Sequence, residues 1–93
     1  MNKTDLIELL FRSLKDEGIT KTSIEKTIDE LIETITTSMQ QGKQIYIKRF
    51  GVFGAKIRKA GHLLNHKKGD IILIPYFHPH ETLRKRIRGL HDT

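Results

Sequence analysis

The stretch QIYIKRFGVFGAKIRK, residues 44–59, decides the fold class, because its apolar residues do not follow a helical period. Residues 44–48 alternate between polar and apolar side chains, which predicts a strand, and residues 49–51 predict a turn. Residues 52–59 predict a second strand, and residues 71–77 predict a third. The segment between them, GHLLNHKKGD at 61–70, carries glycine, histidine and lysine. We therefore expect a three-stranded antiparallel sheet with a protruding basic β-hairpin near residues 55–73.

Helices are predicted on both sides of these strands. One begins at Asn2, a residue that caps helix starts, and ends near residues 16–18. A second runs from Thr20 to Gln41 and stops at Gly42, a favoured residue after a helix end. A last helix is expected to begin around Pro79, which suits a first turn. The order of two helices, three strands and one helix predicts an α+β fold.

The size of the chain and one apolar stripe predict a partner subunit. At 93 residues the chain makes one domain, and domains this small often gain stability by oligomerising. The second helix has a broader apolar stripe than two loosely packed helices need, formed by Ile24, Ile28, Leu31, Ile32, Ile35 and Met39. We therefore expect a dimer.

Charge is distributed unevenly along the chain. Residues 1–42 contain five Lys or Arg and eight Asp or Glu, a net charge of −3, whereas residues 43–93 contain twelve and three, a net charge of +9. This asymmetry predicts a surface that binds a polyanion. A solvated basic surface without a partner is the alternative that charge alone leaves open.

The composition argues against several classes of protein. The chain has no cysteine, which excludes disulfides, thiolate zinc sites and cysteine nucleophiles. It has no apolar run of roughly 20 residues, the length of a membrane span, and no signal-peptide core near its start. Neither a nucleophile motif nor a glycine-rich phosphate loop is present. We expect a cytoplasmic protein without enzymatic activity, cofactor, metal, membrane contact or small-molecule substrate.

Three local motifs stand in order along the chain, namely MNKTDLI at residues 1–7, FGVF at 50–53 and IPYFHP at 74–79 followed by Leu83. Together they resemble the HU/IHF family of bacterial histone-like DNA-bending proteins. The first is similar to the opening of that family, the second matches its Phe-Gly-x-Phe element, and the third resembles its Val-Pro-x-Phe-Lys-Pro…Leu segment. The resemblance implies one intertwined dimeric domain over 1–93. Its parts would be a helical dimerisation base (1–42), a saddle sheet with an arm that grips the minor groove of DNA (43–79) and a C-terminal helix (80–93).

The resemblance and the charges together imply a set of site residues. Cations along a slender ribbon suit minor-groove binding, because phosphates attract strongly while the groove offers little base information. The N-terminus of the last helix, at residues 80–81, would point amides at a phosphate. The expected partner is nucleoid DNA, contacted by Lys3, Lys48, Arg49, Lys56, Arg58, Lys59, His62, Asn65, His66, Lys67, Lys68, His78, Arg84, Lys85, Arg86 and Arg88. The expected core or dimer interface includes Leu31, Ile35, Phe50, Phe53 and Phe77.

The arm departs from the family pattern at its tip. The family has a proline there that wedges between base pairs, whereas neither of two alignments places a proline in this tip. One alignment makes the arm about five residues shorter, and the other places the deletion after Pro75; we prefer the shorter arm. Leu63 and Leu64 are candidate wedges, and the alternative is that they pack across the hairpin. We expect weaker bending than is typical of the family.

Other interpretations remain open at this stage. The aromatic residues Tyr46, Phe50, Phe53, Tyr76 and Phe77 form either a base-stacking platform or, as we favour, the core of the sheet and dimer. Histidines near phosphates would strengthen binding at lower pH. The rival functions are a protein of the same fold that coats or bridges DNA or binds RNA without bending, and a protein-interaction module that has lost DNA binding.

Overall fold

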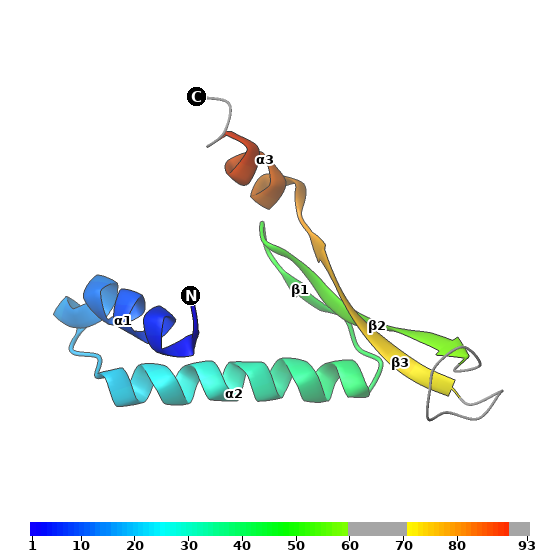
Figure 1. Ribbon diagram of the computed structural model, residues 1–93, viewed down its shortest axis with the longest axis horizontal. Coiled ribbons are helices and arrows are strands. Elements are labelled where there is room, and N and C mark those ends of the chain that lie inside the picture. Colours follow the sequence, from blue (N-terminus) through cyan, green and yellow to red (C-terminus); the bar gives the residue numbers. More distant parts are fainter. Residues whose placement is uncertain (60–70, 90–93) are drawn as a thin grey trace. The chain divides into compact units, whose positions relative to one another are not determined.

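The computed structural model describes residues 1–59 and 71–89 of the chain (Figure 1). Two helices come first, α1 (Lys3–Leu14) and α2 (Lys21–Gln40), separated by a short 3₁₀ helix, η1 (Lys15–Glu17). Three strands follow, β1 (Ile45–Ile47), β2 (Gly51–Lys59) and β3 (Ile71–Pro79), and α3 (Glu81–Gly89) comes last. This order confirms the predicted α+β class.

α2 begins and ends within one residue of its predicted bounds, whereas α1 begins as predicted but ends at Leu14, before the predicted end near residues 16–18. Asn2 caps α1: its side chain accepts a hydrogen bond from the Asp5 amide, and the Asp5 carboxylate accepts one from the Asn2 amide, both at 3.0 Å. This capping box pairs two amides that the helix cannot pair internally. The Thr20 hydroxyl accepts from the Ser23 amide at 3.1 Å at the start of α2. After α2, Gly42 has φ 77°, the left-handed conformation that glycine adopts most readily.

Residues 1–34 form one compact unit, which we call the helical unit, and residues 35–93 form another, the sheet unit. Ile7 of α1 and Ile24 of α2 are the only buried hydrophobic side chains among the described residues. Leu31 and Ile32 are 54% and 55% exposed. So little burial leaves the single chain short of a core, because apolar burial is the main favourable contribution to folding. The functional division of the chain at residues 42 and 79 stays a prediction.

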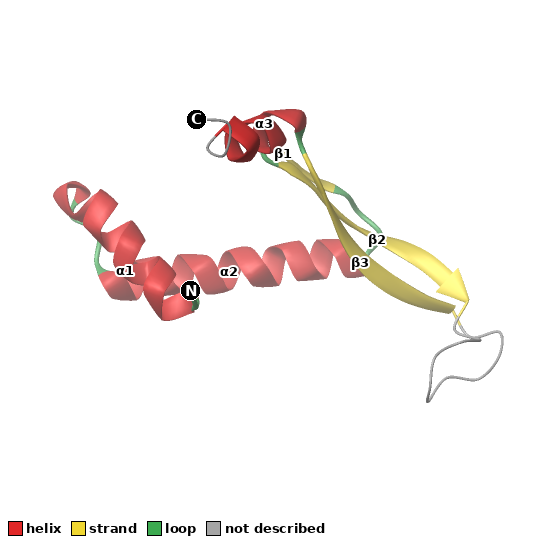
Figure 2. Ribbon diagram, turned by 45° about the horizontal axis from the view of Figure 1, so that its top comes forward, coloured by secondary structure: helices red, strands yellow, loops and turns green. Residues whose placement is uncertain are grey.

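In the sheet unit the strands pair in the antiparallel order β1-β2-β3. β1 pairs only with the first three residues of β2, from Ile45 opposite Phe53 to Ile47 opposite Gly51. β2 and β3 pair along their full lengths, so beyond residue 53 they continue as a two-stranded twisted ribbon (Figure 2). The two paired strands of the predicted hairpin are therefore present, and residues 60–70 between them lie outside the described residues. β1 is shorter than the predicted strand 44–48, and β3 extends to residue 79.

The prediction that Pro79 lies in the first turn of the last helix is wrong. Pro79 is the final residue of β3, opposite Gly51, and α3 begins at Glu81. Pro75 lies on the same strand. Proline donates no backbone hydrogen bond, but among the described strands β3 pairs with a neighbour on one side only, and residues four apart turn their nitrogens to the same side. The edge position therefore accepts both prolines.

A hydrogen bond joins the β1–β2 turn to the start of α3. The Phe50 amide donates to the Ile47 carbonyl at 3.0 Å and closes the turn, in which Arg49 has φ 66°. The His80 amide then donates to the Phe50 carbonyl at 2.8 Å. This contact holds the turn at Phe50 beside His80, the residue that precedes α3. None of the described helices is long and apolar enough to cross a membrane.

Candidate nucleic-acid interface

The strand register divides the sheet into two faces of different chemistry. Side chains alternate along a strand, and directly paired residues share a face. One face, which we call the Lys56 face, carries Tyr46, Val52, Gly54, Lys56, Arg58, Ile72, Ile74, Tyr76 and His78. The opposite face, the Phe53 face, carries Ile45, Ile47, Gly51, Phe53, Ala55, Ile57, Lys59, Ile71, Leu73, Pro75, Phe77 and Pro79.

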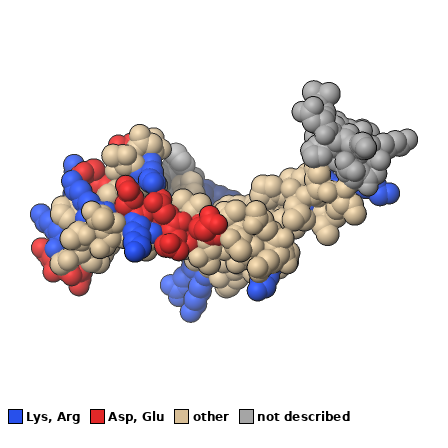
Figure 3. Space-filling view, turned by 90° about the horizontal axis from the view of Figure 1, so that it is seen from below, with Lys and Arg blue, Asp and Glu red and all other residues tan. Residues whose placement is uncertain are grey.

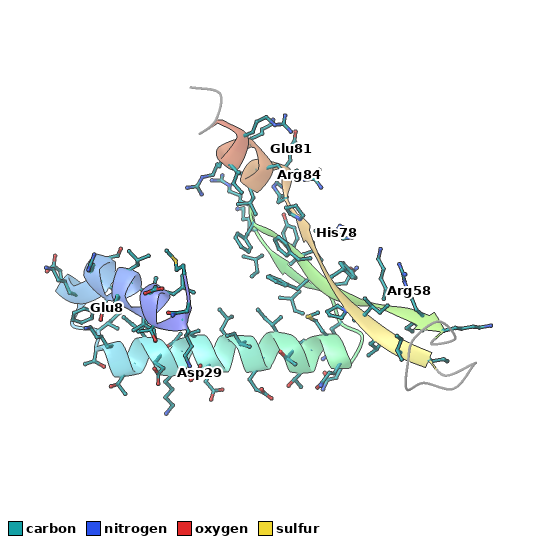
Figure 4. The ribbon with its side chains drawn as sticks, in the orientation of Figure 1. Glu8, Asp29, Arg58, His78, Glu81 and Arg84 are labelled. Carbon is teal, nitrogen blue, oxygen red and sulfur yellow. The ribbon has the colours of Figure 1, made fainter. Side chains whose placement is uncertain are left out.

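The Lys56 face combines cations with aromatic rings. Lys56 and Arg58 share this face, as period-two spacing predicts, and Arg58 projects from the same side of the ribbon as His78 (Figure 4). The Lys56 ammonium lies 5.4 Å from the centre of the Tyr76 ring, and the Tyr76 and His78 ring centres are 4.7 Å apart. Lys59, by contrast, pairs with Ile71 and belongs to the Phe53 face. The register therefore separates two neighbouring cations that the sequence grouped together.

The Phe53 face is apolar and partly uncovered. The Phe53 and Phe77 ring centres are 4.7 Å apart, and those of Phe50 and Phe77 are 5.4 Å apart. Phe50 and Phe77 are nevertheless 42% and 37% exposed. Ala55, Leu73 and Pro75 of this face, with Thr36 and Met39 of α2, line a cavity of about 260 Å³. Of the five residues predicted for a core or dimer interface, none is buried within one chain.

The aromatic residues do not form one stacking platform. Tyr46 and Tyr76 lie on the Lys56 face, whereas Phe53 and Phe77 lie on the other, where Phe50 contacts them. The favoured interpretation, a core and interface role, therefore fits the three phenylalanines and not the two tyrosines. Sequence alternation indicated strands here, but the face that each ring occupies depends on the register.

The two compact units differ in charge. The described part of the sheet unit, residues 35–59 and 71–89, contains ten Lys or Arg and one carboxylate, Glu81. All ten cations are exposed. In Figure 3 the carboxylates gather over the helices, and none is visible on the strands. Within the described part of this unit, Lys85 has an ion pair with Glu81, at 3.2 Å. The remaining cations therefore face solvent with hardly any opposing charge in the described sheet unit, which suits a polyanion.

Lys3 lies in different surroundings. Its ammonium donates to the Asp29 carboxylate at 3.0 Å in the helical unit, and this hydrogen bond and charge raise the pKa of Lys3. Glu25 adds to the increase. A cation already paired with a carboxylate has less to gain from a phosphate, because it must give up that partner. The expected DNA contact of Lys3 is therefore the least supported of the described set.

A backbone amide in the first turn of α3 already has a hydrogen-bond acceptor, the side chain of His80. His80 Nδ1 accepts a hydrogen bond from the Thr82 amide at 3.0 Å, so this amide is not available to a phosphate. The expectation that residues 80–81 point amides at a phosphate is wrong at His80, whose amide donates to the Phe50 carbonyl. The imidazole acts as the N-cap, a role that Ser, Thr, Asp or Asn usually fills. Tyr46 meets His80 edge to face, with ring centres 6.4 Å apart.

The cations of α3 do not all lie away from its apolar side. Arg86, with Leu83 and Ile87, lines a cavity of about 380 Å³ that Phe50 also lines. Arg84, Lys85 and Arg88 are exposed residues outside that lining. Arg86 therefore lies beside apolar residues, and its long alkyl part can pack against them.

Several expected site residues lie outside the described residues, namely His62, Leu63, Leu64, Asn65, His66, Lys67 and Lys68.

Sequence reasoning missed one arrangement on the Lys56 face. The Gln44 amide donates to the Tyr76 hydroxyl at 2.8 Å, across 32 positions of the chain. The Tyr76 ring lies over Gly54: a Cβ at residue 54 would lie 2.5 Å from the hydroxyl oxygen and 2.6 Å from Cζ. A glycine inside a predicted strand indicates that another group approaches the backbone closely, and Gly54 was the sequence signal that could have indicated this contact.

Comparison with known proteins agrees with this arrangement. Residues 1–88 match the protein family described as "Bacterial DNA-binding protein". Integration host factor subunit beta from Aliivibrio fischeri is 32% identical over 92 residues, covering 94% of this chain and 97% of the relative. A mutant of HU from Thermotoga maritima superposes with a TM-score of 0.66 at 30% identity, over 94% of this chain and 99% of that one. An Anabaena HU–DNA cocrystal structure has the same fold, with a TM-score of 0.68 at 18% identity, over 94% and 97% of the two chains.

Proposed function

Because this chain belongs to the bacterial DNA-binding protein family, with HU and integration host factor among its relatives, we propose that its Lys56 face lies against duplex DNA. As a family member it is a non-enzymatic, architectural DNA-binding protein that acts as a dimer on double-stranded DNA. We infer that it works on the nucleoid in the bacterial cytoplasm. The proposal concerns which of its residues make the contact.

One observation carries the proposal: Lys56 and Arg58 project from a single face in a unit whose described part holds one carboxylate. Duplex DNA carries a closely spaced row of phosphates and a layer of condensed counterions. Each cation that replaces a counterion releases it, which favours binding at low salt. Two cations at consecutive positions on one face of a ribbon can follow such a row, because alternate residues on a strand lie roughly 7 Å apart.

The turn and α3 extend the same cationic surface. Lys48 and Arg49 directly precede Phe50, whose carbonyl accepts a hydrogen bond from the His80 amide just before α3. α3 itself carries Arg84 and Arg88. All four cations are exposed. We assign them to phosphates that flank the central contact. This binding depends on backbone charge and shape, so we expect little preference for sequence.

Dimer formation explains the uncovered apolar side chains of the single chain. Phe50, Phe77, Leu31 and Ile32 together expose more apolar surface than a stable monomer of this size normally leaves in water. A second subunit that covers part of this surface supplies the missing core. The Phe53 face is then occupied by protein, which leaves the Lys56 face for DNA.

The test is a salt titration of binding to a 30-base-pair duplex, followed by fluorescence anisotropy. For the parent protein the logarithm of the association constant falls steeply with the logarithm of salt concentration. Removal of one phosphate contact reduces that slope by about 0.9, and a homodimer loses two contacts for each substitution. We expect Lys56→Ala and Arg58→Ala each to reduce the slope by up to about two.

The matched control is Lys15→Ala, which removes an exposed cation from the helical unit. Its slope is expected to equal that of the parent. Equal slopes for all four proteins would contradict the assignment of the Lys56 face, and a flat salt dependence of the parent would contradict the whole mechanism.

A further inference from the structure

We propose that the Tyr76 hydroxyl is a preset, uncharged hydrogen-bond donor to a backbone phosphate of DNA, with Gln44 as its positioning residue. The proposal rests on the proposed function of the Lys56 face. It adds to that face a binding site whose partner chemistry, an anionic phosphodiester oxygen, follows from the geometry around one side chain.

The Tyr76 ring fits directly against β2 because Gly54 has no side chain there. Any Cβ at residue 54 would come within 2.5 to 3.0 Å of three Tyr76 atoms, so the ring occupies the space above β2. The ring thereby extends from β3 across β2, and its hydroxyl lies next to Gln44, which precedes β1. Tyrosine has only two side-chain torsions to order, so the loss of conformational freedom on binding DNA is small.

The hydrogen bond from Gln44 sets the direction of the hydroxyl proton. A tyrosine hydroxyl has one proton to donate and lone pairs to accept with. The Gln44 amide donates to the oxygen at 2.8 Å, and Gln44 is the only hydrogen-bonding partner of this hydroxyl within the described residues. The proton is therefore left for an external acceptor, and a hydroxyl that accepts one bond becomes a stronger donor in a second.

The surroundings select an anionic acceptor. The Lys56 ammonium lies 5.4 Å from the centre of the ring, and the His78 ring lies beside it at 4.7 Å. The one described carboxylate of the sheet unit is bound to Lys85 on α3. A phosphodiester oxygen has lone pairs and negative charge but no proton, so it complements both the hydroxyl and the ammonium. A hydrogen-bond donor of a ligand would instead have to compete with the Gln44 amide, which already donates to this hydroxyl oxygen.

The proposal separates two kinds of contact that a salt titration distinguishes. An ammonium that meets a phosphate releases counterions, whereas an uncharged hydroxyl releases none. Loss of the Tyr76 hydroxyl should therefore weaken binding by the same factor at every salt concentration. For one net hydrogen bond we expect roughly three- to tenfold weaker binding per contact, and a homodimer has two.

The experiment compares Tyr76→Phe with the parent on a 30-base-pair duplex at five salt concentrations. The variant keeps the ring over Gly54 and removes only the hydroxyl. We expect a parallel shift of the binding line to weaker affinity, with an unchanged slope and an unchanged thermal unfolding midpoint. Binding equal to the parent, or a reduced slope, would overturn the proposal.

Ser13→Ala is the control for the loss of a hydroxyl, because Ser13 is exposed on α1 of the helical unit and lies outside the Lys56 face. Its affinity should change less than twofold; a loss as large as that of Tyr76→Phe would overturn the assignment of this contact to Tyr76.

A double-mutant cycle tests Gln44 directly. Gln44→Leu should weaken binding by itself, yet add nothing when Tyr76 is already Phe, because the two residues act on one contact. Independent, additive losses would overturn the positioning role. Failure of the function proposed for the Lys56 face has a different signature, namely an unchanged slope in Lys56→Ala and Arg58→Ala, so the two proposals fail separately.

Discussion

At the scale of single residues, Arg49 has a backbone conformation that its side chain disfavours. Its φ of 66° belongs to the left-handed region, where a non-glycine residue costs on the order of 1 kcal/mol. The turn needs this conformation, because the Phe50 amide closes it onto the Ile47 carbonyl. Glycine would adopt it without strain. An exposed arginine at such a position suggests that its charge is useful.

We predict that Arg49→Gly stabilises the fold and weakens DNA binding. Relief of strain should raise the free energy of unfolding by roughly 0.5–1 kcal/mol, measured by urea denaturation. Loss of one cation per subunit should reduce the salt slope by up to about two. Arg49→Lys keeps both charge and strain, so it should resemble the parent in both measurements. A less stable Arg49→Gly protein would contradict the account of strain.

Gly54 is the second residue whose role follows from close contact. We predict that Gly54→Ala lowers the free energy of unfolding by about 1–3 kcal/mol, because its Cβ would collide with the Tyr76 ring. In the double variant Gly54→Ala, Tyr76→Ser, the collision is gone and the added cost of the alanine should largely disappear. Urea denaturation of the four proteins measures this coupling. Additive effects would show that the ring does not lie over residue 54.

At the scale of the elements, the β2–β3 ribbon sorts its residues by register. Arg58 pairs with Ile72 on the Lys56 face, whereas Lys59 pairs with Ile71 on the Phe53 face, although the two cations are adjacent in sequence. On the Phe53 face Ile57 and Ile71 are 71% and 70% exposed, so this side of the ribbon is apolar apart from Lys59. The two faces should therefore contribute unequally to DNA binding.

We predict that Arg58→Ala reduces the salt slope more than Lys59→Ala does. The neighbouring lysine is the best available control, since it has a similar distance to the arm tip, similar exposure and the opposite face. Filter binding or anisotropy at several salt concentrations gives both slopes. A larger effect at Lys59 would reverse the assignment of faces.

At the scale of the whole molecule, the chain is incomplete without a partner subunit. Only Ile7 and Ile24 are buried hydrophobic residues in its described part, and large apolar side chains are exposed in both compact units. A fold that gains its core from a second subunit unfolds with loss of that subunit, so its stability depends on protein concentration.

We therefore predict that the thermal unfolding midpoint rises with protein concentration. Calorimetry over a hundredfold range of concentration measures the shift, and light scattering gives the mass of the folded species. A midpoint that does not change with concentration, together with the mass of one chain, would contradict an obligate dimer.

The tip of the arm, which bears on the fate of bound DNA, lies outside the described residues, and our expectation for it comes from sequence. We predict weaker bending than a proline-tipped family member produces, because the tip has no proline. Fluorescence transfer between the ends of a labelled duplex measures the bend. A full bend that disappears in Leu63→Ala or Leu64→Ala would instead identify a leucine wedge.

Much of the fold was predictable because its signals are local. The capping box at Asn2 and Asp5, the glycine after α2, the alternation of residues 44–59 and the asymmetry of charge each depend on residues a few positions apart or on simple counts. From these the sequence alone determined the order of elements, the hairpin and a cationic sheet unit. The family resemblance extended this to a dimeric DNA-binding protein.

Only the tertiary structure decided which side chains meet. That Tyr76 reaches Gln44 over Gly54, that Lys59 lies on the opposite face from Arg58, and that His80 caps α3 all depend on the register and on the exact path of the chain. A shift of one residue in the pairing would move the side chains of one strand to the opposite face of the sheet. No local sequence pattern determines the register of two strands that are separated by residues 60–70. The long-range pairing therefore determined the composition of the site, although the sequence had already supplied its charge.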